Sequence, residues 1–173
     1  MGRVSVLIAA LALLVAGSAA AQDPMRAFSP PNGRFTVMMP GTPQSESAPL
    51  TQTNGKTTTS HRFWSSPDND SVAYMLTYSD DTEPQVMPGR LEIARDELLQ
   101  TSPATLLSDR VISLNGIPGR AYTARGTDDG VLYDMQIYYA GRRLYQLITL
   151  TSPGNTAPFR DAFMSSFRIL SQQ

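Results

Sequence analysis

Residues 115–120 read NGIPGR, two glycines and a proline between two apolar runs, and their interpretation decides the fold. A phosphate-binding loop needs backbone N–H groups that converge on the anion together with a following helix N-terminus. Here the glycines are three residues apart, no Lys-Ser or Lys-Thr pair follows, and the next stretch, RAYTAR, is typical of a strand. Since glycine and proline are the common residues of turns, the segment predicts a hairpin turn.

Around this turn the sequence predicts an antiparallel meander. The expected strands cover residues 106–114, 120–126, 131–139 and 143–150. Three turns separate them: NGIPG, then Asp128-Asp129-Gly130, then Ala140-Gly141. In residues 131–139 the side chains of odd-numbered and even-numbered positions are expected on opposite faces of the sheet.

The first half of the chain also alternates like strands. Residues 34–39 form one expected strand, and residues 45–53 and 56–64 form a hairpin joined by Asn54-Gly55. Asn-Gly is the common pair of a type I′ turn, in which both central residues need positive φ. Residues 71–79 (SVAYMLTYS) alternate cleanly and predict a further strand, with Val72, Tyr74, Leu76 and Tyr78 on one face.

Two segments change to helical period. Residues 88–100 place Leu91, Ala94 and Leu98 on one face, with Pro88 near the first turn, and predict an amphipathic helix. A second, short helix follows near the C-terminus, capped by Asn155 or Thr156 with Pro158 in its first turn. Its predicted buried face consists of Phe159, Ala162, Phe163 and Ser166, and residues 167–170 predict a last short strand.

Together these elements predict one α+β domain. It has an antiparallel sheet of about six to eight strands with two or more helices packed on it. The expected organisation is a signal peptide at residues 1–21, a short tether at residues 22–27 and the domain at residues 28–173.

The first 21 residues indicate export. Arg3 is followed by an apolar run at residues 4–15 and by Ala19-Ala20-Ala21, a signal-peptidase site that leaves Gln22 as the N-terminus. The run is shorter than the roughly 20 residues of a membrane span. We therefore expect a cleaved leader, no stable membrane insertion of the mature chain, and a periplasmic location.

Composition excludes several classes of site. The sequence has no cysteine, so it has no disulfide, thiolate metal site or cysteine nucleophile. Without Arg3, 13 basic side chains face 15 acidic ones, a balance that argues against nucleic-acid binding. His61 is the only histidine and cannot build a multi-imidazole zinc site. No catalytic residue, metal or cofactor is predicted.

Two alternatives stay open on the residues alone. A Ser-His-Asp triad through His61 requires only geometry, although no G-x-S-x-G motif marks a nucleophile. The acidic groups at Asp80, Asp81 and Glu83, and at Asp128-Asp129, are typical of turns and helix starts, with a weak calcium site as the alternative.

The arginines and tyrosines of the meander are the candidate recognition residues. Arg142 and Arg143 occupy a predicted hairpin tip, and in-order pairing would bring Arg120 and Arg125 to neighbouring strands. Such a group could receive an acidic partner, or it could be a charged sheet edge that discourages aggregation. Tyrosines of the meander that are not buried in the core could add to this recognition surface. The predicted partner-binding set is Arg120, Arg125, Tyr138, Arg142 and Arg143.

Several short motifs resemble the PsbP-like group: AFSPPNGRFTVMMPGTP at residues 27–43, L-x-G-x-P-G-R at 114–120, RRLYQL at 142–147, and Ser166-Phe167. The resemblance implies an α-β-α sandwich, shared with a Ran-binding protein and with periplasmic lipoproteins of the DcrB type. It also implies accessory or binding roles, with no shared catalytic residues. The chain departs from the lipoproteins in lacking a lipobox cysteine, and its single histidine gives little support to photosystem-type metal chemistry.

Three functions follow from these observations. The first is a non-enzymatic accessory protein that binds an envelope protein. The second is a carrier with a small-ligand pocket between sheet and helix. The third is a serine hydrolase that uses His61.

Overall fold

The computed structural model describes residues 24–52, 54–67, 71–83 and 89–170 and contains two antiparallel sheets. The larger sheet has seven strands and the smaller has three. In spatial order, the larger sheet consists of β3 (Gln44–Thr51), β4 (Thr57–Ser65), β5 (Val72–Asp80), β9 (Arg143–Thr151), β8 (Leu132–Ala140), β7 (Ile117–Gly126) and β6 (Ala104–Leu114). The smaller consists of β1 (Met25–Phe28), β2 (Phe35–Pro40) and β10 (Arg168–Ile169). The predicted α+β class and sheet size are confirmed.

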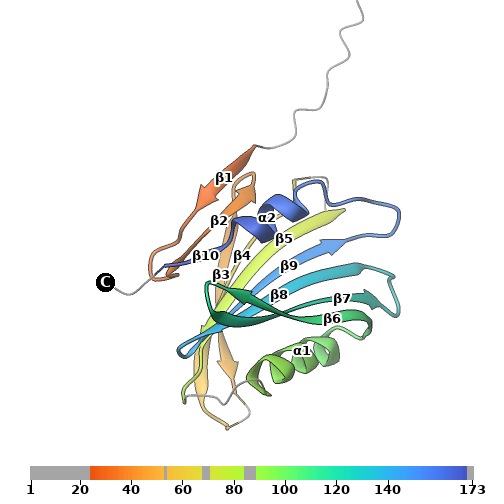
Figure 1. The fold of residues 1–173 in the computed structure, drawn as a ribbon. Coiled ribbons are helices and arrows are strands. Elements are labelled where there is room, and N and C mark those ends of the chain that lie inside the picture. The colour runs from red at the N-terminus through yellow and green to blue at the C-terminus, as the bar shows by residue number, and fades with distance from the viewer. Residues whose placement is uncertain (1–23, 53, 68–70, 84–88, 171–173) are drawn as a thin grey trace, which may run out of the picture.

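The seven-stranded sheet is covered on both faces. The helix α1 (Gly89–Thr101) packs on one face, while the short helix α2 (Arg160–Ser166) and the small sheet cover the other (Figure 1). Side chains of the sheet alternate between the two layers, so that Tyr138 joins one core and Tyr139 the other. The arrangement is a sandwich with the large sheet in the middle.

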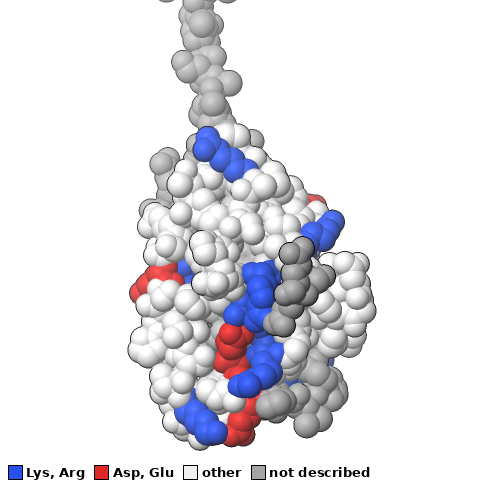
Figure 2. Space-filling view, turned by 90° about the vertical axis from the view of Figure 1, so that its left-hand side faces the viewer, with Lys and Arg blue, Asp and Glu red and all other residues white. Residues whose placement is uncertain are grey.

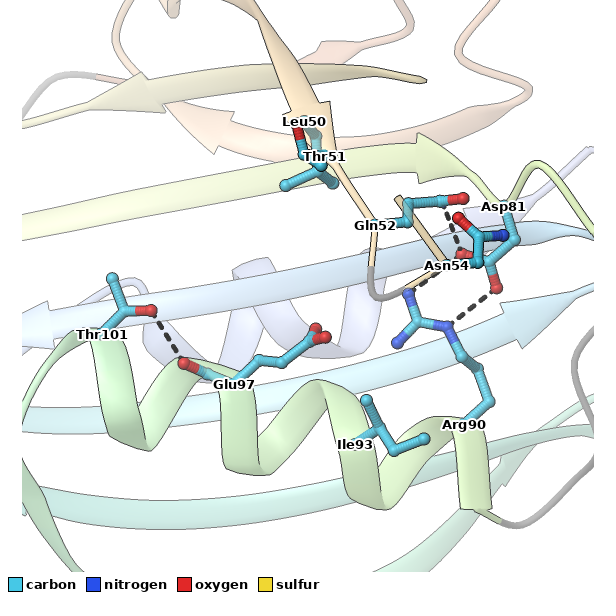
Figure 3. A pocket seen from close by; sticks show the side chains of 9 residues that line it. All are labelled: Leu50, Thr51, Gln52, Asn54, Asp81, Arg90, Ile93, Glu97 and Thr101. Carbon is cyan, nitrogen blue, oxygen red and sulfur yellow. Dashed lines mark hydrogen bonds and ion pairs between the residues drawn. The ribbon is translucent and has the colours of Figure 1, made fainter. Parts of the chain in front are cut away.

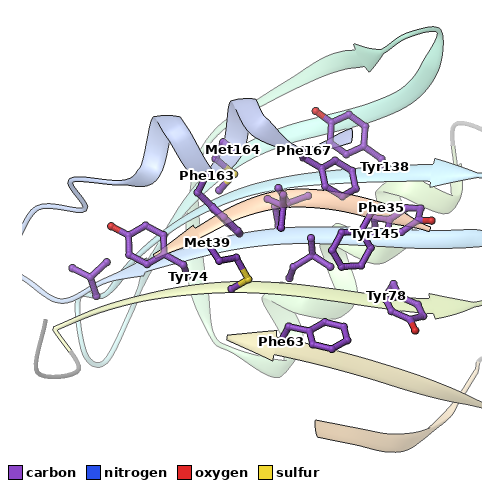
Figure 4. Close-up of a cluster of buried hydrophobic side chains, with 14 residues drawn as sticks. Phe35, Met39, Phe63, Tyr74, Tyr78, Tyr138, Tyr145, Phe163, Met164 and Phe167 are labelled. Atoms are coloured by element: carbon purple, nitrogen blue, oxygen red, sulfur yellow. The ribbon is translucent and has the colours of Figure 1, made fainter. Parts of the chain in front are cut away.

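The larger of the two cores lies between the large sheet and β2. Phe35 and Phe163 are completely buried there, and the ring of Phe35 contacts those of Tyr78, Tyr145 and Phe167 (Figure 4). The predicted inward face of β5 is part of this core: Val72, Tyr74, Leu76 and Tyr78. Aromatic packing therefore holds the small sheet onto the large one.

The meander is confirmed, and its first turn is tighter than expected. Asn115 and Gly116 have φ of 50° and 82°, and Leu114 pairs with Ile117, as in a two-residue hairpin. The strand after the turn therefore begins at Ile117 rather than Arg120. Gly119 lies within this strand against Tyr138, where a β-carbon would come within 2.5 Å of Cδ1 of Tyr138.

The Asn54-Gly55 hairpin is confirmed, but its turn is not of the predicted type. Gly55 has a φ of 78°. The N–H of Gly55 donates to the carbonyl of Gln52 at 2.9 Å, and Oδ1 of Asn54 accepts from the N–H of Lys56. The longer loop forms because the Asn54 side chain bonds to the backbone two residues on.

The predicted face of α1 is confirmed. Leu91 and Ala94 are buried, and Leu98 packs partly buried against the same core. Pro88, predicted for the first turn, lies outside the described residues. Arg90, which the sequence analysis did not single out, is buried as well, with only 8% exposed.

The C-terminal helix begins later than predicted. It starts at Arg160 after Phe159, which makes no side-chain cap, so Pro158 lies outside the helix. Asn155 does not cap it either, because its amide donates to the carbonyls of Ser152 and Pro153. The inward face also differs: Ala162 is exposed, and Met164 is buried beside Phe163.

The N-terminal part of the described chain contains a strand that the sequence did not predict. Met25, Arg26 and Ala27, assigned to a tether, pair with β2 as part of β1. The predicted strand at residues 34–39 is β2, but it pairs with β1 and β10 rather than with the large sheet. Over the described residues, no helix has the length and apolar character required to cross a membrane.

Candidate functional site

Arg142 and Arg143 lie at the β8–β9 hairpin tip, but their side chains have different surroundings. Arg143 is buried, and its Nε and Nη2 donate to the two carboxylate oxygens of Asp80, each at 2.6 Å. Its guanidinium also lies 4.4 Å from the centre of the Tyr78 ring. The hydrogen bond from Arg143 lowers the pKa of Asp80, against the opposing effect of burial. Arg143 is therefore engaged inside the fold.

Arg143 and Tyr145 also fix the turn between β1 and β2. Nη1 of Arg143 donates to the carbonyls of Asn32 at 2.6 Å and Gly33 at 3.1 Å, and the Tyr145 hydroxyl donates to Gly33. Asn32 and Arg34 adopt positive φ of 63° and 55° in this turn. The motifs PPNGR and RRLYQL thus meet in space, and the second binds the backbone of the first.

Arg142 is exposed and is held by the backbone. Its Nε and Nη2 donate to the carbonyl of Asp81 at 2.9 and 2.6 Å, and its own carbonyl accepts the N–H of Asp81. Over the part of the chain that the structure describes, no carboxylate forms an ion pair with Arg142. The result is a cation of fixed orientation at the protein surface.

The surface around Arg142 is hollowed and charged. A depression of about 530 Å³ is lined by Arg34, Asp80, Ala140, Gly141 and Arg142. It adjoins a second depression of about 320 Å³ that includes Ile169 and the exposed Leu170. Figure 2 shows basic and acidic side chains in one band down this side of the molecule. We call this surface, the lining of the two depressions, the tip surface.

The other predicted partner-binding residues lie elsewhere. Arg120 faces α1, where it binds Asp109 at 2.7 Å and Glu92 at 3.2 Å. Arg125 is exposed on the opposite face of β7, at the end of the strand remote from the β8–β9 tip. The expected grouping of four arginines is therefore wrong, because in-order pairing distributes them over both faces and both ends of the sheet.

The tyrosines do not form a recognition patch. Tyr138 is only 6% exposed and stacks on Phe167 at a centroid distance of 5.6 Å. Burial raises its pKa and those of Tyr122 and Tyr145. Tyr139 is buried as well, and only Tyr133 of the five is partly exposed. These side chains serve the two cores.

The acidic groups mostly serve structural roles. Asp80, Asp81 and Glu83 form ion pairs with Arg143, Arg90 and Lys56, respectively. Oδ1 of Asp129 accepts the N–H of Val131 within its turn, as predicted for turn chemistry. Within the described ranges, no three histidine or acidic side chains gather in a way that could hold a metal.

His61 does contact a serine. Its Nδ1 lies 2.8 Å from Oγ of Ser47, and its ring stacks on Tyr78 at 4.6 Å. The contact follows from register, since Ser47 and His61 are direct cross-strand partners in β3 and β4. Among the described residues, no carboxylate binds the His61 ring. The pair therefore lacks the third member that orients the histidine of a triad.

A pocket of about 290 Å³ lies between α1 and the end of β3. The sequence suggested a pocket between sheet and helix but did not identify the residues that line it. Asp81 and Arg90 meet at its wall, where Nε of Arg90 lies 2.8 Å from Oδ2 of Asp81 (Figure 3). The pair is almost completely buried. Its sequence signal is weak, because Arg90 sits next to the apolar stripe of α1 and resembles any solvent-facing arginine.

Comparisons with known proteins identify the fold. No protein-family model and no curated protein matches this chain. The chain is similar to the solution structure of cyanobacterial PsbP (CyanoP) from Synechocystis sp. PCC 6803, with a TM-score of 0.57 and 10% identity over 88% of this chain and 95% of that one. A protein of unknown function from Pseudomonas aeruginosa, PA94, has a TM-score of 0.43 and 10% identity over 80% of this chain and 90% of its own, too weak a likeness to carry an argument. This chain has a PsbP-like fold.

Proposed function

We propose that this chain is an exported, non-enzymatic accessory protein that holds a protein partner in the cell envelope. The leader-like residues 1–21 support export, and a periplasmic location of the mature chain is part of the proposal. An accessory role is supported by the PsbP-like fold, although a fold by itself is a weak guide to function. The surface chemistry must therefore carry the proposal.

The observation that supports the proposal most directly is that the Arg142 side chain is exposed and held in one orientation. Two hydrogen bonds from its guanidinium to one carbonyl fix its orientation before any partner arrives. An exposed, pre-oriented arginine that lacks a carboxylate among the described residues is suited to an acidic side chain of a partner. Leu170, 45% exposed beside the same depression, supplies apolar contact area. The partner surface should thus combine a carboxylate with an apolar residue.

The test is affinity purification of the tagged protein after crosslinking in living cells. One dominant envelope protein is expected to co-purify with the wild type and to be lost with Arg142→Glu. Arg143 is left unchanged, because a glutamate at that buried position would oppose Asp80 inside the fold.

Arg125→Glu is the matched control. Arg125 is also an exposed arginine of the meander, but it lies at the remote end of β7. The proposal predicts that this variant retains the partner. Loss with Arg125→Glu and retention with Arg142→Glu would place the binding surface at the wrong end of the sheet and contradict the proposal.

A small-ligand carrier is the second candidate, and one observation favours it. The pocket beside α1 contains a buried arginine atom, Nη1 of Arg90, that has no hydrogen-bond partner among the described residues. Such an atom is costly to leave unpaired in the interior. Thermal stabilisation by a periplasmic metabolite would support the carrier role. An unchanged melting temperature across a metabolite library would argue against it.

A further inference from the structure

The pocket between α1 and β3 has one wall formed by a single face of the helix. Arg90, Ile93, Glu97 and Thr101 line it at positions i, i+3, i+7 and i+11. Leu50 and Thr51 of β3 and the following loop close the opposite side. At about 290 Å³, the volume is near the lower end of the roughly 300–1,000 Å³ typical of small-molecule sites. The ligand must be small.

Arg90 supplies a free donor to this space. Its Nε and Nη2 bind the carboxylate of Asp81 at 2.8 and 3.1 Å, while Nη1 is buried and finds no hydrogen-bond partner in the part of the chain that the structure describes. The side chain is only 9% exposed, so water does not solvate the charge freely. Figure 3 shows the guanidinium between the start of α1 and Asp81, at the wall of the pocket. An acceptor on a ligand would satisfy Nη1.

Glu97 supplies the opposite charge. No hydrogen bond or ion pair engages its carboxylate among the described residues, and Figure 3 shows it pointing along the helix towards Arg90. The neighbouring polar groups are already used: Gln52 binds Asp81 and Thr82, and Asn54 binds Thr82 and Lys56. The Nη1 donor of Arg90, whose charge is paired with Asp81, and the unpaired carboxylate of Glu97 are therefore the groups that remain for a ligand.

The remaining lining is apolar and open. Leu50 and Ile93 are 39% and 44% exposed, so both offer apolar surface to a ligand. They flank the two charged groups in the same pocket. A ligand with an aliphatic part would cover them.

We propose that this pocket binds a small zwitterion with an aliphatic side chain, of the size of an α-amino acid or a dipeptide. The ligand carboxylate accepts a hydrogen bond from Nη1 of Arg90, the ammonium group donates to Glu97, and the side chain packs on Leu50 and Ile93. This inference rests on the carrier role named above as the second candidate. It is independent of Arg142 and of partner binding.

Isothermal titration of the purified protein tests the ligand class with four probes. L-leucine and L-leucyl-L-leucine carry both charges, L-leucinamide lacks the carboxylate, and 4-methylpentanoate lacks the ammonium group. We expect saturable binding of leucine or of the dipeptide. Each probe that lacks one charge should bind at least about tenfold more weakly. No saturable heat with either zwitterion would overturn the proposal.

Variants separate the two charged contacts. Glu97→Gln should weaken binding of the zwitterion at least about tenfold. Binding of 4-methylpentanoate should not weaken, because this probe has no ammonium group to contact the Glu97 carboxylate. Glu46→Gln, an exposed glutamate of β3 outside the pocket, is the matched control and should change neither. Arg90→Lys keeps the charge beside Asp81 but removes the guanidinium, and should weaken both probes. Unchanged zwitterion affinity in Glu97→Gln and Arg90→Lys would contradict the assigned contacts.

The same variants distinguish this inference from the proposed function. If the pocket binds no zwitterion but Arg142→Glu still loses the envelope partner, only the inference fails. If the zwitterion binds and no partner co-purifies, the accessory role fails and the carrier role is supported.

Discussion

Gly119 leaves no space for a side chain in the middle of the sheet. A β-carbon there would lie 2.5 Å from Cδ1 of Tyr138 and 2.7 Å from the carbonyl oxygen of Ile137. Since that carbonyl belongs to the adjacent strand, it cannot move without disturbing the ladder. We predict that Gly119→Ala lowers the free energy of unfolding by about 1–3 kcal/mol, measured by urea denaturation. Gly89→Ala, where nothing lies within 4 Å of the added carbon, should have no such cost. Equal effects would contradict this explanation.

Asp80 makes part of the stability depend on pH. Arg143 lowers its folded pKa, so Asp80 stabilises the fold above its unfolded pKa of about 3.9, and this contribution is lost as the pH falls through the folded pKa. We predict that the stability difference between wild type and Asp80→Asn is constant above about pH 5 and shrinks below about pH 4. Denaturation across this range measures it. Asp161→Asn, whose side chain is 92% exposed, is the control. A difference that grows in acid would show that the sign is wrong.

At the scale of elements, one carboxylate joins α1 to the β6–β7 hairpin. Asp109 of β6 accepts hydrogen bonds from Arg95 of α1 and Arg120 of β7, and its side chain is 14% exposed. Burial opposes ionisation, but these two arginines outweigh it and lower the pKa of Asp109. Its removal would leave each of two partly buried guanidinium groups without one of its two carboxylate partners, since Arg95 also binds Asp96 and Arg120 also binds Glu92.

We therefore predict that Asp109→Ala lowers the free energy of unfolding by about 1–3 kcal/mol. Asp96→Ala is the matched control, because Asp96 binds the same Arg95 but is 52% exposed. It should cost less than about 1 kcal/mol. Chemical denaturation compares the two, and equal losses would show that Asp109 does not anchor the helix.

Helices and strands with a clear hydrophobic period could be predicted from the sequence. A short strand that forms only by pairing with a neighbouring strand could not. Val72 to Tyr78 alternate over a whole strand, and Leu91, Ala94 and Leu98 repeat at helical spacing, so both faces were correctly assigned. β1 has only four residues, and its two partly buried ones, Met25 and Phe28, lie on opposite faces, so its pairing with β2 leaves no periodic signal. The predicted side-chain cap of α2 was wrong: Asn155 bonds to its own turn, and Phe159, which precedes the helix, makes no cap.

At the scale of the molecule, the two cores share one sheet. Tyr138 contributes to the core under α2, and its neighbours Ile137 and Tyr139 contribute to the core under α1. Loosening one core therefore disturbs the strands that form the other. We predict a single unfolding transition in which Leu91→Ala costs about 2–5 kcal/mol. Trp64 fluorescence, which reports on β4, should show the same midpoint as circular dichroism. Separate midpoints would show that the two layers unfold independently.

The candidate site was less predictable than the fold, because its residues depend on long-range contacts. The sequence places Arg142 and Arg143 side by side, but only the packing of β5 and of the β1–β2 turn explains why one is buried and the other exposed. Asp81 was predicted only as a turn residue and Arg90 was not singled out, and their pairing depends on how α1 packs beside the end of β5. The predicted strand order around Arg120 and Arg125 was correct. The prediction did not consider that these two side chains point to opposite faces of the sheet.

The most direct test of the accessory role is photo-crosslinking from single positions in living cells. A photoreactive phenylalanine derivative would replace Leu170, which is 45% exposed on the tip surface, or Val111, which is 79% exposed on the edge strand β6. Val111 pairs with Arg120 and lies on the α1 side of the sheet, the face opposite the tip surface. The account predicts one envelope-protein adduct from position 170 and none from position 111. An adduct only from position 111, or none from either, would contradict it.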